Sequence, residues 1–497
     1  MKPDKTSTTP LYIQIREELR DSILSGTLKT GERLPTVNAF ASEKDVTAAT
    51  IRRALQDLME EGLITSHVGR GTFVGTPEKK PIDNTPQFPA EASVAARTLR
   101  QSINRSLGEM MTLAQKPGVI AFTRGIADPD TIEKGTLTRL AQKALADGEE
   151  LFWDYGDPRG LLPLRKAIAK LYAEQGIPVT SEQILVTSGS QQAIALVAQA
   201  AAENRTKILC ETPCYTGVTN AFSAFNLHIE TVMRDAEGPD ISRLPAHVDT
   251  ADSIFYLCPV LHNPMGTDIS PARQRQISEW ALANHVTLLA DEVFRDLHTD
   301  GDAPVSFLKD PGPERSIILG SVSKSFISGL RVGWIVTSEE RIRVLTQIKK
   351  AMDLGCPPLM QGIARAFLED QHGYSAHRTK IRAHYRTLRD TTVQALETYM
   401  PKEVEWTVPC GGFQLWVTLP KGFSSVELYI RSVEKGVAFL PGPLQDINNR
   451  FLNSFRLCYG SLGIEDIRTG IMRLSEAVRE YLDESPGETG MSGLGDF

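Results

Sequence analysis

The chain has 497 residues, more than one ordinary domain needs, and its composition is that of a soluble globular protein. Its formal net charge is −7, so the chain as a whole lacks the basic character that indicates nucleic-acid binding. No apolar run is long enough to span a bilayer and the N-terminus lacks a signal peptide's apolar core, so we expect a cytoplasmic protein without membrane contact. The six cysteines form no Cys-x-x-Cys pair, so we expect buried small hydrophobes rather than a metal site or disulfides.

Three helices are predicted near the N-terminus. Apolar side chains recur at helical spacing over 11–24, and a short helix opens at Pro35-Thr36 and runs to about residue 44. Thr47 caps a third helix that runs from residue 48 to about 61. The apolar side of this third helix is formed by Ile51, Leu55, Leu58 and Met59.

A β-hairpin follows these helices. Residues 64–74 read as two short strands, with Gly69-Arg70-Gly71 at the tip. Three helices and a hairpin make a winged helix-turn-helix, which we assign to residues 8–75.

The N-terminal segment resembles the GntR family of bacterial regulators. The resemblance lies in four phrases, Pro10-Leu11-Tyr12-Ile13-Gln14-Ile15, Gly31-Glu32-Arg33-Leu34-Pro35-Thr36, Thr50-Ile51-Arg52-Arg53-Ala54-Leu55 and Gly69-Arg70-Gly71-Thr72-Phe73-Val74. It implies binding to double-stranded DNA, with the third helix in the major groove and the wing at the minor groove or backbone. The candidate DNA-contacting residues are Arg33, Thr36, Thr47, Thr50, Arg52, Arg53 and Arg70.

Two features temper the DNA-binding interpretation. The family often has arginine where this chain has Asn38 and Ala48. Residues 1–75 carry as many acidic as basic side chains, which predicts weak non-specific binding even if the cations share one face. The cations expected on that face are Arg33, Lys44, Arg52, Arg53 and Arg70. A winged helix used only for protein contacts is the alternative.

Residues 76–116 change character. Four prolines fall close together amid polar residues, which predicts an extended or mobile connector, and 93–113 predicts a helix that starts the larger domain. The Gly-rich tail, 483–497, is expected to be disordered.

From 117 to 482 helical stretches alternate with short apolar runs. This alternation predicts an α/β fold with a mainly parallel sheet, in which ligand-binding groups lie on loops at the strand ends. The apolar runs are Ile184–Val186, Lys207–Cys210, Ile254–Cys258, Thr287–Ala290, Ile317–Leu319 and Val332–Val336.

Lys324 is the most informative residue of this region. It lies among small hydroxyl residues, and Arg331 follows seven positions later. A lysine that forms a Schiff base needs a place where it can lose its proton, and a phosphate needs hydroxyl donors and a fixed cation. Pyridoxal 5′-phosphate demands both, so we expect Lys324 to hold it and Ser321, Ser323 and Arg331 to bind its phosphate. A surface lysine beside a Ser-rich turn is the alternative.

Further cofactor contacts are expected at the ends of the other apolar runs. The turn at Ser188, Gly189, Ser190 and Gln191 would bind phosphate at a helix start. Tyr215 would stack on the pyridine ring, Asn263 would donate to the phenolic oxygen, and Asp291 would pair with the ring nitrogen. Taken singly, these residues also suit an ordinary N-cap turn, a packed tyrosine, an Asn-Pro turn and a loop cap.

The order and spacing of these groups resemble fold-type I aminotransferases, whose fold adds a smaller C-terminal α/β subdomain. The resemblance implies that Tyr155 reaches the phosphate of a neighbouring subunit. It also implies that Arg456, preceded by the glycine-rich strand start Gly411-Gly412-Phe413, grips a substrate carboxylate. The chain departs from the pattern at Phe294, where a tyrosine usually bonds the cofactor, and this departure argues against efficient transamination.

Both halves together resemble the MocR family of regulators, which implies a head-to-tail homodimer. The leading hypothesis is a transcription regulator whose aminotransferase-like domain senses an amino-acid-like amine or pyridoxal phosphate itself. A working aminotransferase with an appended DNA-binding head is the second hypothesis, and a dimeric scaffold with a structural cofactor is the third.

Overall fold

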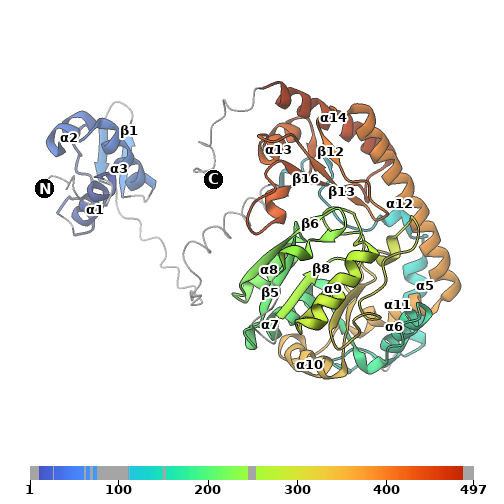
Figure 1. The fold of residues 1–497 in the computed structure, drawn as a ribbon. Helices are drawn as coiled ribbons and strands as arrows, with labels where there is room; N and C mark the ends of the chain where they lie inside the picture. The colour runs from blue at the N-terminus through green and yellow to red at the C-terminus, as the bar shows by residue number, and fades with distance from the viewer. Residues whose placement is uncertain are drawn as a thin grey trace. The chain divides into compact units, whose positions relative to one another are not determined.

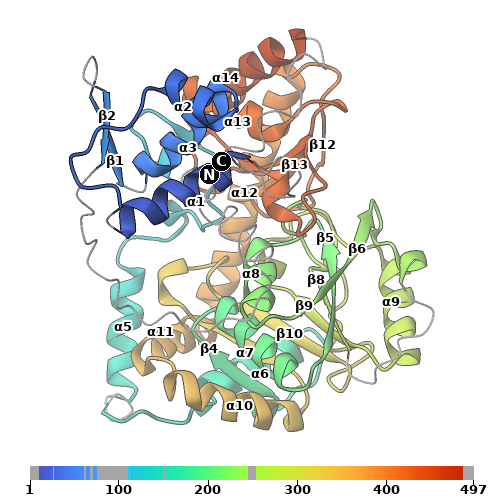
Figure 2. The same ribbon diagram turned by 90° about the vertical axis from the view of Figure 1, so that its left-hand side faces the viewer.

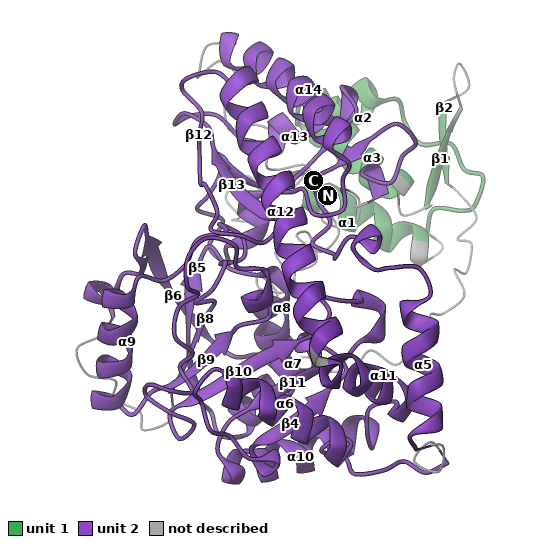
Figure 3. Cartoon of the chain, turned by 90° about the vertical axis from the view of Figure 1, so that its right-hand side faces the viewer, with its two compact units in different colours: residues 1–91 green, residues 92–497 purple. Residues whose placement is uncertain are grey.

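The computed structural model describes residues 11–25, 27–60, 63–67, 71–74, 110, 112–148, 153–244 and 253–484. The chain forms two compact units, residues 1–91 and residues 92–497 (Figure 3). No helix within the described residues is both long enough and apolar enough to cross a bilayer.

Unit 1 has the expected winged-helix elements, and Thr47 caps the third helix as predicted, while Thr36 caps the second. Thr36 accepts a hydrogen bond from the Ala39 backbone N–H at 3.3 Å, and Thr47 accepts one from the Thr50 N–H at 3.3 Å. The elements are α1 (Leu11–Leu24), α2 (Val37–Lys44), α3 (Ala48–Glu60) and the antiparallel strands β1 (Ile64–His67) and β2 (Gly71–Val74).

Three expectations for unit 1 need correction. Met59 is 38 % exposed, and Ala54 replaces it on the buried side of α3, because position 54 lies one turn after the buried Ile51. Lys44 is buried and paired with Glu18 at 2.8 Å, so it does not belong to an exposed basic face. Gly71 begins β2 opposite His67 rather than forming the hairpin tip, while residues 68–70, Arg70 included, lie outside the described residues.

Unit 2 is built on an eight-stranded, mainly parallel sheet, as predicted. All six apolar runs are strands of this sheet, and only β11 and the terminal β7 run against the others. Its order is β4 (Ile184–Thr187), β11 (Gly333–Val336), β10 (Ser316–Ser321), β9 (Thr287–Asp291), β8 (Ser253–Leu257), β5 (Lys207–Thr212), β6 (Ile229–Asp235) and β7 (Gly238–Pro239).

Helices cover both faces of this sheet (Figures 1 and 2). Successive strand residues alternate between two apolar clusters, as Leu288 and Leu289 do, because strand side chains point to opposite faces. One face packs on α5 (Thr136–Ala146), α6 (Leu162–Glu174), α9 (Pro271–Ala283) and α11 (Pro358–Glu369). The other packs on α7 (Ser190–Glu203), α8 (Thr216–Ala224) and α10 (Glu339–Asp353).

A smaller C-terminal part completes unit 2. Its antiparallel sheet runs in the order β12 (Glu405–Trp406), β13 (Gln414–Thr418), β16 (Ser454–Cys458) and β15 (Leu440–Pro441). A two-stranded parallel pair joins β3 (Ile120–Ala121) to β14 (Val437–Ala438), so the start of unit 2 is tied to its C-terminal part. The helices here are α13 (Ser425–Glu434), α14 (Ile464–Asp483) and the long α12 (Gln371–Tyr399), which runs past both sheets in Figure 1.

Short 3-10 helices connect several of these elements. They are η1 (Pro129–Thr131), η3 (Ser181–Gln183), η4 (Ile241–Arg243), η5 (Arg295–Leu297), η6 (Ser328–Leu330) and η7 (Gly442–Gln445). Of the helix predicted over 93–113, only residues 110 and 112–113 are described, and they are helical. The rest of the predicted connector up to residue 109 and the tail from 485 onward lie outside the described residues, while α14 extends through Asp483.

Candidate functional site

The predicted cofactor residues of unit 2 gather where the parallel strands end. Ser188 follows β4, Tyr215 follows β5, Asn263 follows β8, Asp291 ends β9 and Lys324 follows β10. Because these strands run in the same direction, their carboxyl ends meet at one edge of the sheet. The fold therefore brings together side chains that are spread over more than 130 positions of the sequence.

Lys324 lies at the centre of this edge. Burial lowers the pKa of its ammonium group, and the nearby Arg456 and Arg331 guanidinium groups lower it further. Its Nζ donates a hydrogen bond of 2.7 Å to the Gly125 carbonyl oxygen. A lysine in this setting gives up its proton more readily than a lysine in water, which is the property a Schiff-base former needs.

Asp291 is a buried carboxylate that takes part in no ion pair within the described residues. It accepts hydrogen bonds from the Tyr256 hydroxyl at 3.2 Å and from the Val293 N–H at 3.3 Å. Burial nevertheless raises the pKa of Asp291 to about 6. Its hydrogen bonds are satisfied but its charge is not balanced, so the position favours a cationic partner.

Arg456 and Asn263 are held against each other. Arg456 Nη1 donates to Asn263 Oδ1 at 2.9 Å, and Nη2 donates to the Thr123 carbonyl oxygen at 3.1 Å. The Arg456 Nε and the Thr123 hydroxyl are buried and have no hydrogen-bond partner. Unsatisfied buried donors beside a fixed guanidinium are groups that an anionic ligand would satisfy.

The predicted phosphate turn lies at the start of α7. Arg331 Nη2 donates to the Ser188 carbonyl oxygen at 3.2 Å, and a side chain at Gly189 would collide with the Arg331 guanidinium. Glycine at 189 therefore lets the cation approach the helix start, where backbone N–H groups already favour an anion.

Not every predicted phosphate donor keeps its side chain available. Ser323 Oγ is buried without a partner and is available. The Ser321 hydroxyl instead donates to the Val332 carbonyl oxygen at 2.9 Å and accepts from the Ser323 N–H at 3.0 Å, so it shapes the turn. Gln191 donates to the Gly217 carbonyl oxygen at 2.9 Å and accepts from the Tyr215 hydroxyl at 3.2 Å, so its role is to hold the tyrosine.

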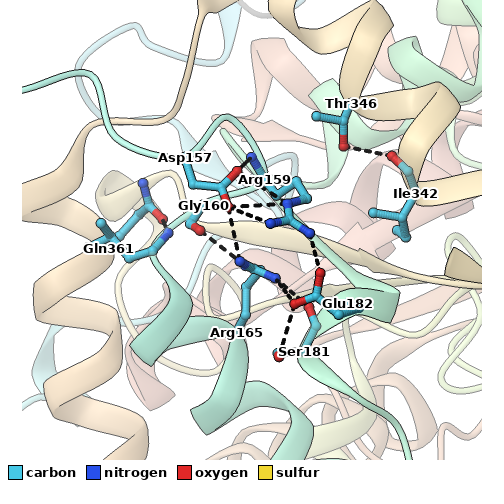
Figure 4. A network of polar contacts seen from close by, with 10 residues as sticks. Asp157, Arg159, Gly160, Arg165, Ser181, Glu182, Ile342, Thr346 and Gln361 are labelled. Carbon is cyan, nitrogen blue, oxygen red and sulfur yellow. Dashed lines mark hydrogen bonds and ion pairs between the residues drawn. The ribbon is translucent and has the colours of Figure 1, made fainter.

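Tyr155 faces outward, with 75 % of its surface exposed. The loop that carries it is anchored by a network in Figure 4, in which Asp157 pairs with Arg159 at 2.9 Å and with Arg165 at 3.1 Å. Glu182 pairs with both arginines, and Arg165 is almost fully buried. A rigid loop thus presents an aromatic side chain that this chain does not itself cover.

Phe294 lies beside Lys324, whose Nζ is 5.6 Å from the centre of the phenyl ring. The ring packs edge-on against Phe413, with centroids 5.4 Å apart. It contributes an apolar wall at a place where it can donate no hydrogen bond.

Pyridoxal phosphate, the group predicted from the sequence, fits these residues. The unbalanced Asp291 suits a protonated pyridine nitrogen, and the unpartnered Ser323 hydroxyl and the start of α7 suit a phosphate. Lys324 would supply the amine, and burial lowers the pKa of that amine.

Three contributors to the site were missed by sequence reasoning. Tyr256 bonds Asp291 from the adjacent strand, and Gln192 accepts from the Ser188 N–H at 2.7 Å while donating to Asp353. The Thr123 carbonyl oxygen accepts a hydrogen bond from Arg456. Only Gln192 carried a signal, since it directly follows the predicted phosphate turn at residues 188–191. The other two depend on how distant segments pair.

Unit 1 presents the predicted DNA-contacting residues on and around α3. Arg52 and Arg53 are exposed, and the Arg53 guanidinium carbon lies 4.3 Å from the centre of the Tyr12 ring. Thr36 and Thr47 are exposed at the starts of α2 and α3, while Thr50 is partly buried one turn into α3. The Arg33 side chain lies against Gly71 at the base of the wing.

Comparisons with known proteins agree with this division of the chain. The profile described as "Aminotransferase class I and II" matches residues 119–474, and that described as "Bacterial regulatory proteins, gntR family" matches residues 11–74. An uncharacterized HTH-type transcriptional regulator of Bacillus subtilis, YdfD, is 27% identical and covers 96% of this chain and 98% of its own length. The 2-aminoadipate transaminase of Thermus thermophilus is 33% identical over 76% of this chain and 94% of its own.

Solved structures resemble unit 2. The multiple substrate aminotransferase of Thermococcus profundus is 28% identical, with a TM-score of 0.71 over 76% of this chain and 96% of its own. The α-aminoadipate aminotransferase LysN of Thermus thermophilus, complexed with N-(5′-phosphopyridoxyl)-L-leucine, is 29% identical, with a TM-score of 0.67 over 76% of this chain and 99% of its own.

The pKa of Asp291 leads to a first prediction. Because its folded-state pKa is above the ordinary value of 3.8, charging it costs the folded protein about 3 kcal/mol once the pH exceeds about 6. In protein stripped of pyridoxal phosphate, Asp291→Asn should therefore raise the free energy of unfolding by up to that amount at pH 8 and change it little near pH 4. Urea denaturation at the two pH values measures this.

Asp302→Asn is the matched control, since Asp302 is exposed. It should be neutral at both pH values. Equal effects of Asp291→Asn at pH 4 and pH 8 would contradict the assignment of the cost to the buried charge. With the cofactor present the sign should reverse, because the asparagine no longer offers a negative partner to the ring nitrogen.

Proposed function

Because the chain belongs to the family of class I and II aminotransferases and also carries a GntR-type module, we propose that it is a MocR-type transcription regulator that uses pyridoxal phosphate to sense a small amine. The observation that carries the proposal is one chain in which a buried lysine of lowered pKa lies near an unbalanced aspartate, while a separate unit presents a winged helix. Relatives named as uncharacterized HTH-type transcriptional regulators match this chain over nearly its whole length.

Pyridoxal phosphate is the cofactor of this fold, and we assign its binding to the residues at the strand ends. Asp291 would face the ring nitrogen, Tyr215 would cover the ring, and Ser323 and Arg331 with the start of α7 would hold the phosphate. When bound, the cofactor supplies an aldehyde that condenses with amines and a ring that draws electrons from the new bond.

The chain's own residues define what else can enter. Lys324 is the amine that would hold the cofactor, and the lowering of its pKa by burial favours exchange with an incoming amine. Arg456 is fixed by Asn263 and the Thr123 carbonyl in a pose that leaves Nε without a partner. A guanidinium held this way favours a carboxylate, so the effector class is an amine that carries a carboxylate.

Phe294 supports a sensor in preference to an efficient enzyme. At the position where relatives of this fold usually place a hydroxyl donor, the chain has a phenyl ring packed on Phe413. The missing hydrogen bond weakens stabilisation of charge on the cofactor without removing any group that binds it.

The regulator is proposed to act as a head-to-tail homodimer. Tyr155 is exposed on an anchored loop, which is the arrangement needed for a side chain that completes the site of a second copy. Two copies carry two winged helices, which suits DNA with two half-sites. Effector binding changes DNA binding only if the effector's affinity differs between two arrangements of the dimer.

Lys324→Ala tests the proposed function. Wild type should carry a cofactor that borohydride reduction fixes to the chain, and its binding to DNA from upstream of its own gene should change when a carboxylate-bearing amine is added. Lys324→Ala should lose both properties yet still bind that DNA, because unit 1 is unaltered. Mass spectrometry after reduction and fluorescence anisotropy with labelled DNA measure the two.

Lys309→Ala removes an exposed lysine of the same unit and should behave as wild type. If Lys324→Ala keeps an undiminished response to the amine, the cofactor is structural and the sensing role fails.

The DNA-binding surface makes a separate prediction. Arg52→Ala combined with Arg53→Ala should weaken DNA binding tenfold or more, because each lost contact costs roughly 1–3 kcal/mol, and should lower the salt slope by about one per lost phosphate contact. Titrations at several salt concentrations provide both values.

Arg20→Ala with Lys29→Ala removes two charges of unit 1 outside α3 and serves as the control. Arg52→Ala alone guards against loss of folding, since Arg53 packs on Tyr12. Unchanged affinity and salt slope in the α3 variants would mean that another surface contacts DNA.

Phe294→Tyr addresses the enzyme alternative. Wild type should turn over an amino donor and a keto acid only slowly, while the added hydroxyl should raise the rate of transamination about 10- to 100-fold, the value of one hydrogen bond to a charged group. Coupled assays of keto-acid formation measure the rate.

The matched variant Phe451→Tyr adds a hydroxyl at a partly exposed phenylalanine that packs edge-on against Trp416 of the small sheet. It should leave the rate unchanged. Sustained turnover by wild type at the rates of ordinary aminotransferases would favour the enzyme hypothesis over the regulator.

A further inference from the structure

Three side chains with metal-binding atoms converge at the junction between the two parts of unit 2. They are Asp268 from the loop after β8, His298 from the segment after η5, and Cys410 just before β13. One carboxylate oxygen, one imidazole nitrogen and the thiol sulfur lie within 4.8 Å of one another. Across the residues that the structure describes, no other trio of such side chains comes this close.

The cluster is held in place by its backbone. His298 pairs with Gly411 in an antiparallel bridge, and the Cys410 carbonyl oxygen accepts hydrogen bonds from the N–H groups of Thr299 at 3.0 Å and Asp300 at 3.2 Å. On the third segment, Asp268 Oδ1 accepts from the Leu261 N–H at 2.8 Å. Positions fixed by main-chain bonds cost little entropy when they receive a ligand.

The side chains themselves are incompletely satisfied. His298 is 4 % exposed, and its Nδ1 is buried without a hydrogen-bond partner. Its Nε2 lies 2.7 Å from Asp268 Oδ2. Among the described residues, His298 is the one ion-pair partner of the Asp268 carboxylate. A doubly charged cation would neutralise Asp268 together with a Cys410 thiolate, and the partial exposure of both side chains leaves it a path from solvent.

We propose that Asp268, His298 and Cys410 form a binding site for a divalent metal ion of the zinc class. Sulfur, imidazole nitrogen and carboxylate oxygen together are the donor set that Zn²⁺ takes, and three protein ligands leave a fourth position for water. Sequence analysis predicted no metal site because the three ligands lie 30 and 112 positions apart and share no motif.

The proposed metal site lies between the two parts of unit 2, so a bound ion would stabilise the fold whether or not the proposed function holds. Asp268 follows Asn263 by five residues on a loop whose Met265 carbonyl accepts from Thr407 at 2.6 Å. His298 belongs to the large part of unit 2 and Cys410 to the small part. A metal held here ties the two parts together, so it should stabilise the folded chain.

Zinc binding to the full-length protein with its cofactor tests the proposal. Competition with a chromogenic chelator should give one Zn²⁺ per chain in wild type and a melting temperature that rises with zinc. Cys410→Ser and His298→Gln should each bind about 100-fold more weakly, and Asp268→Asn about tenfold or more. Co²⁺ bound in place of Zn²⁺ should give visible ligand-field bands at longer wavelength than the cofactor absorbs. In Cys410→Ser these bands should shift, because the thiolate ligand is gone.

Cys210→Ser is the matched control, because Cys210 is fully buried and lies outside the cluster. It should bind zinc as wild type does. Absence of stoichiometric zinc in wild type, or equal affinity in wild type, Cys410→Ser and His298→Gln, overturns the proposal and leaves an adventitious ion only. If the variant at 298 or 410 fails to fold, Asp268→Asn still tests whether the cluster binds zinc.

Discussion

A buried carboxylate without a cation of its own, Asp291, is the constraint on which the site depends. The parallel strands fix it at an edge where Tyr256 and a backbone N–H satisfy its hydrogen bonds but not its charge. Burial acts on Lys324 in the opposite sense, so the pKa of the acid rises and the pKa of the base falls. Burial thus penalises the charged form of both groups, and a ligand that brings a cationic ring and an anionic phosphate into reach offsets that penalty.

The electrostatics of unit 1 follow from how its acidic residues are used. The segment is formally neutral, but three of its acidic residues pair with other cations of the unit: Glu18 holds the buried Lys44, and Asp57 and Glu17 contact Arg16. Arg33, Arg52 and Arg53 appear in none of the ion pairs of the described residues and are exposed. A neutral sequence can therefore present a positive surface near α3.

Sequence reasoning succeeded where the signal was local. Buried parallel strands read as apolar runs, and Thr36 and Thr47 cap helices through bonds to N–H groups three residues away. Five predicted site residues lie at the ends of five parallel strands, and the topology of the sheet brings them to one edge: Ser188, Tyr215, Asn263, Asp291 and Lys324.

It failed where a role depends on pairing between distant segments. Tyr256 reaches Asp291 only because β8 and β9 align in register, and Ser321 and Gln191 prove to hold the turn and the tyrosine instead of facing outward as donors. Lys44 was assigned to the exposed face because its burial depends on Glu18, 26 positions away. The Asp268, His298 and Cys410 cluster belongs to the same class, since no spacing rule joins its members.

Phe294 shows how binding and chemistry can separate within one fold. Every group proposed to hold the cofactor is present, yet the side chain beside the Lys324 amine is a phenyl ring, which can donate no hydrogen bond and packs on Phe413. A sensor needs the ligand to be captured and released with its structure unchanged, whereas an enzyme needs charge to be stabilised after capture. Loss of one hydroxyl reduces only the second requirement, so a single substitution of this kind moves an aminotransferase fold towards reversible recognition.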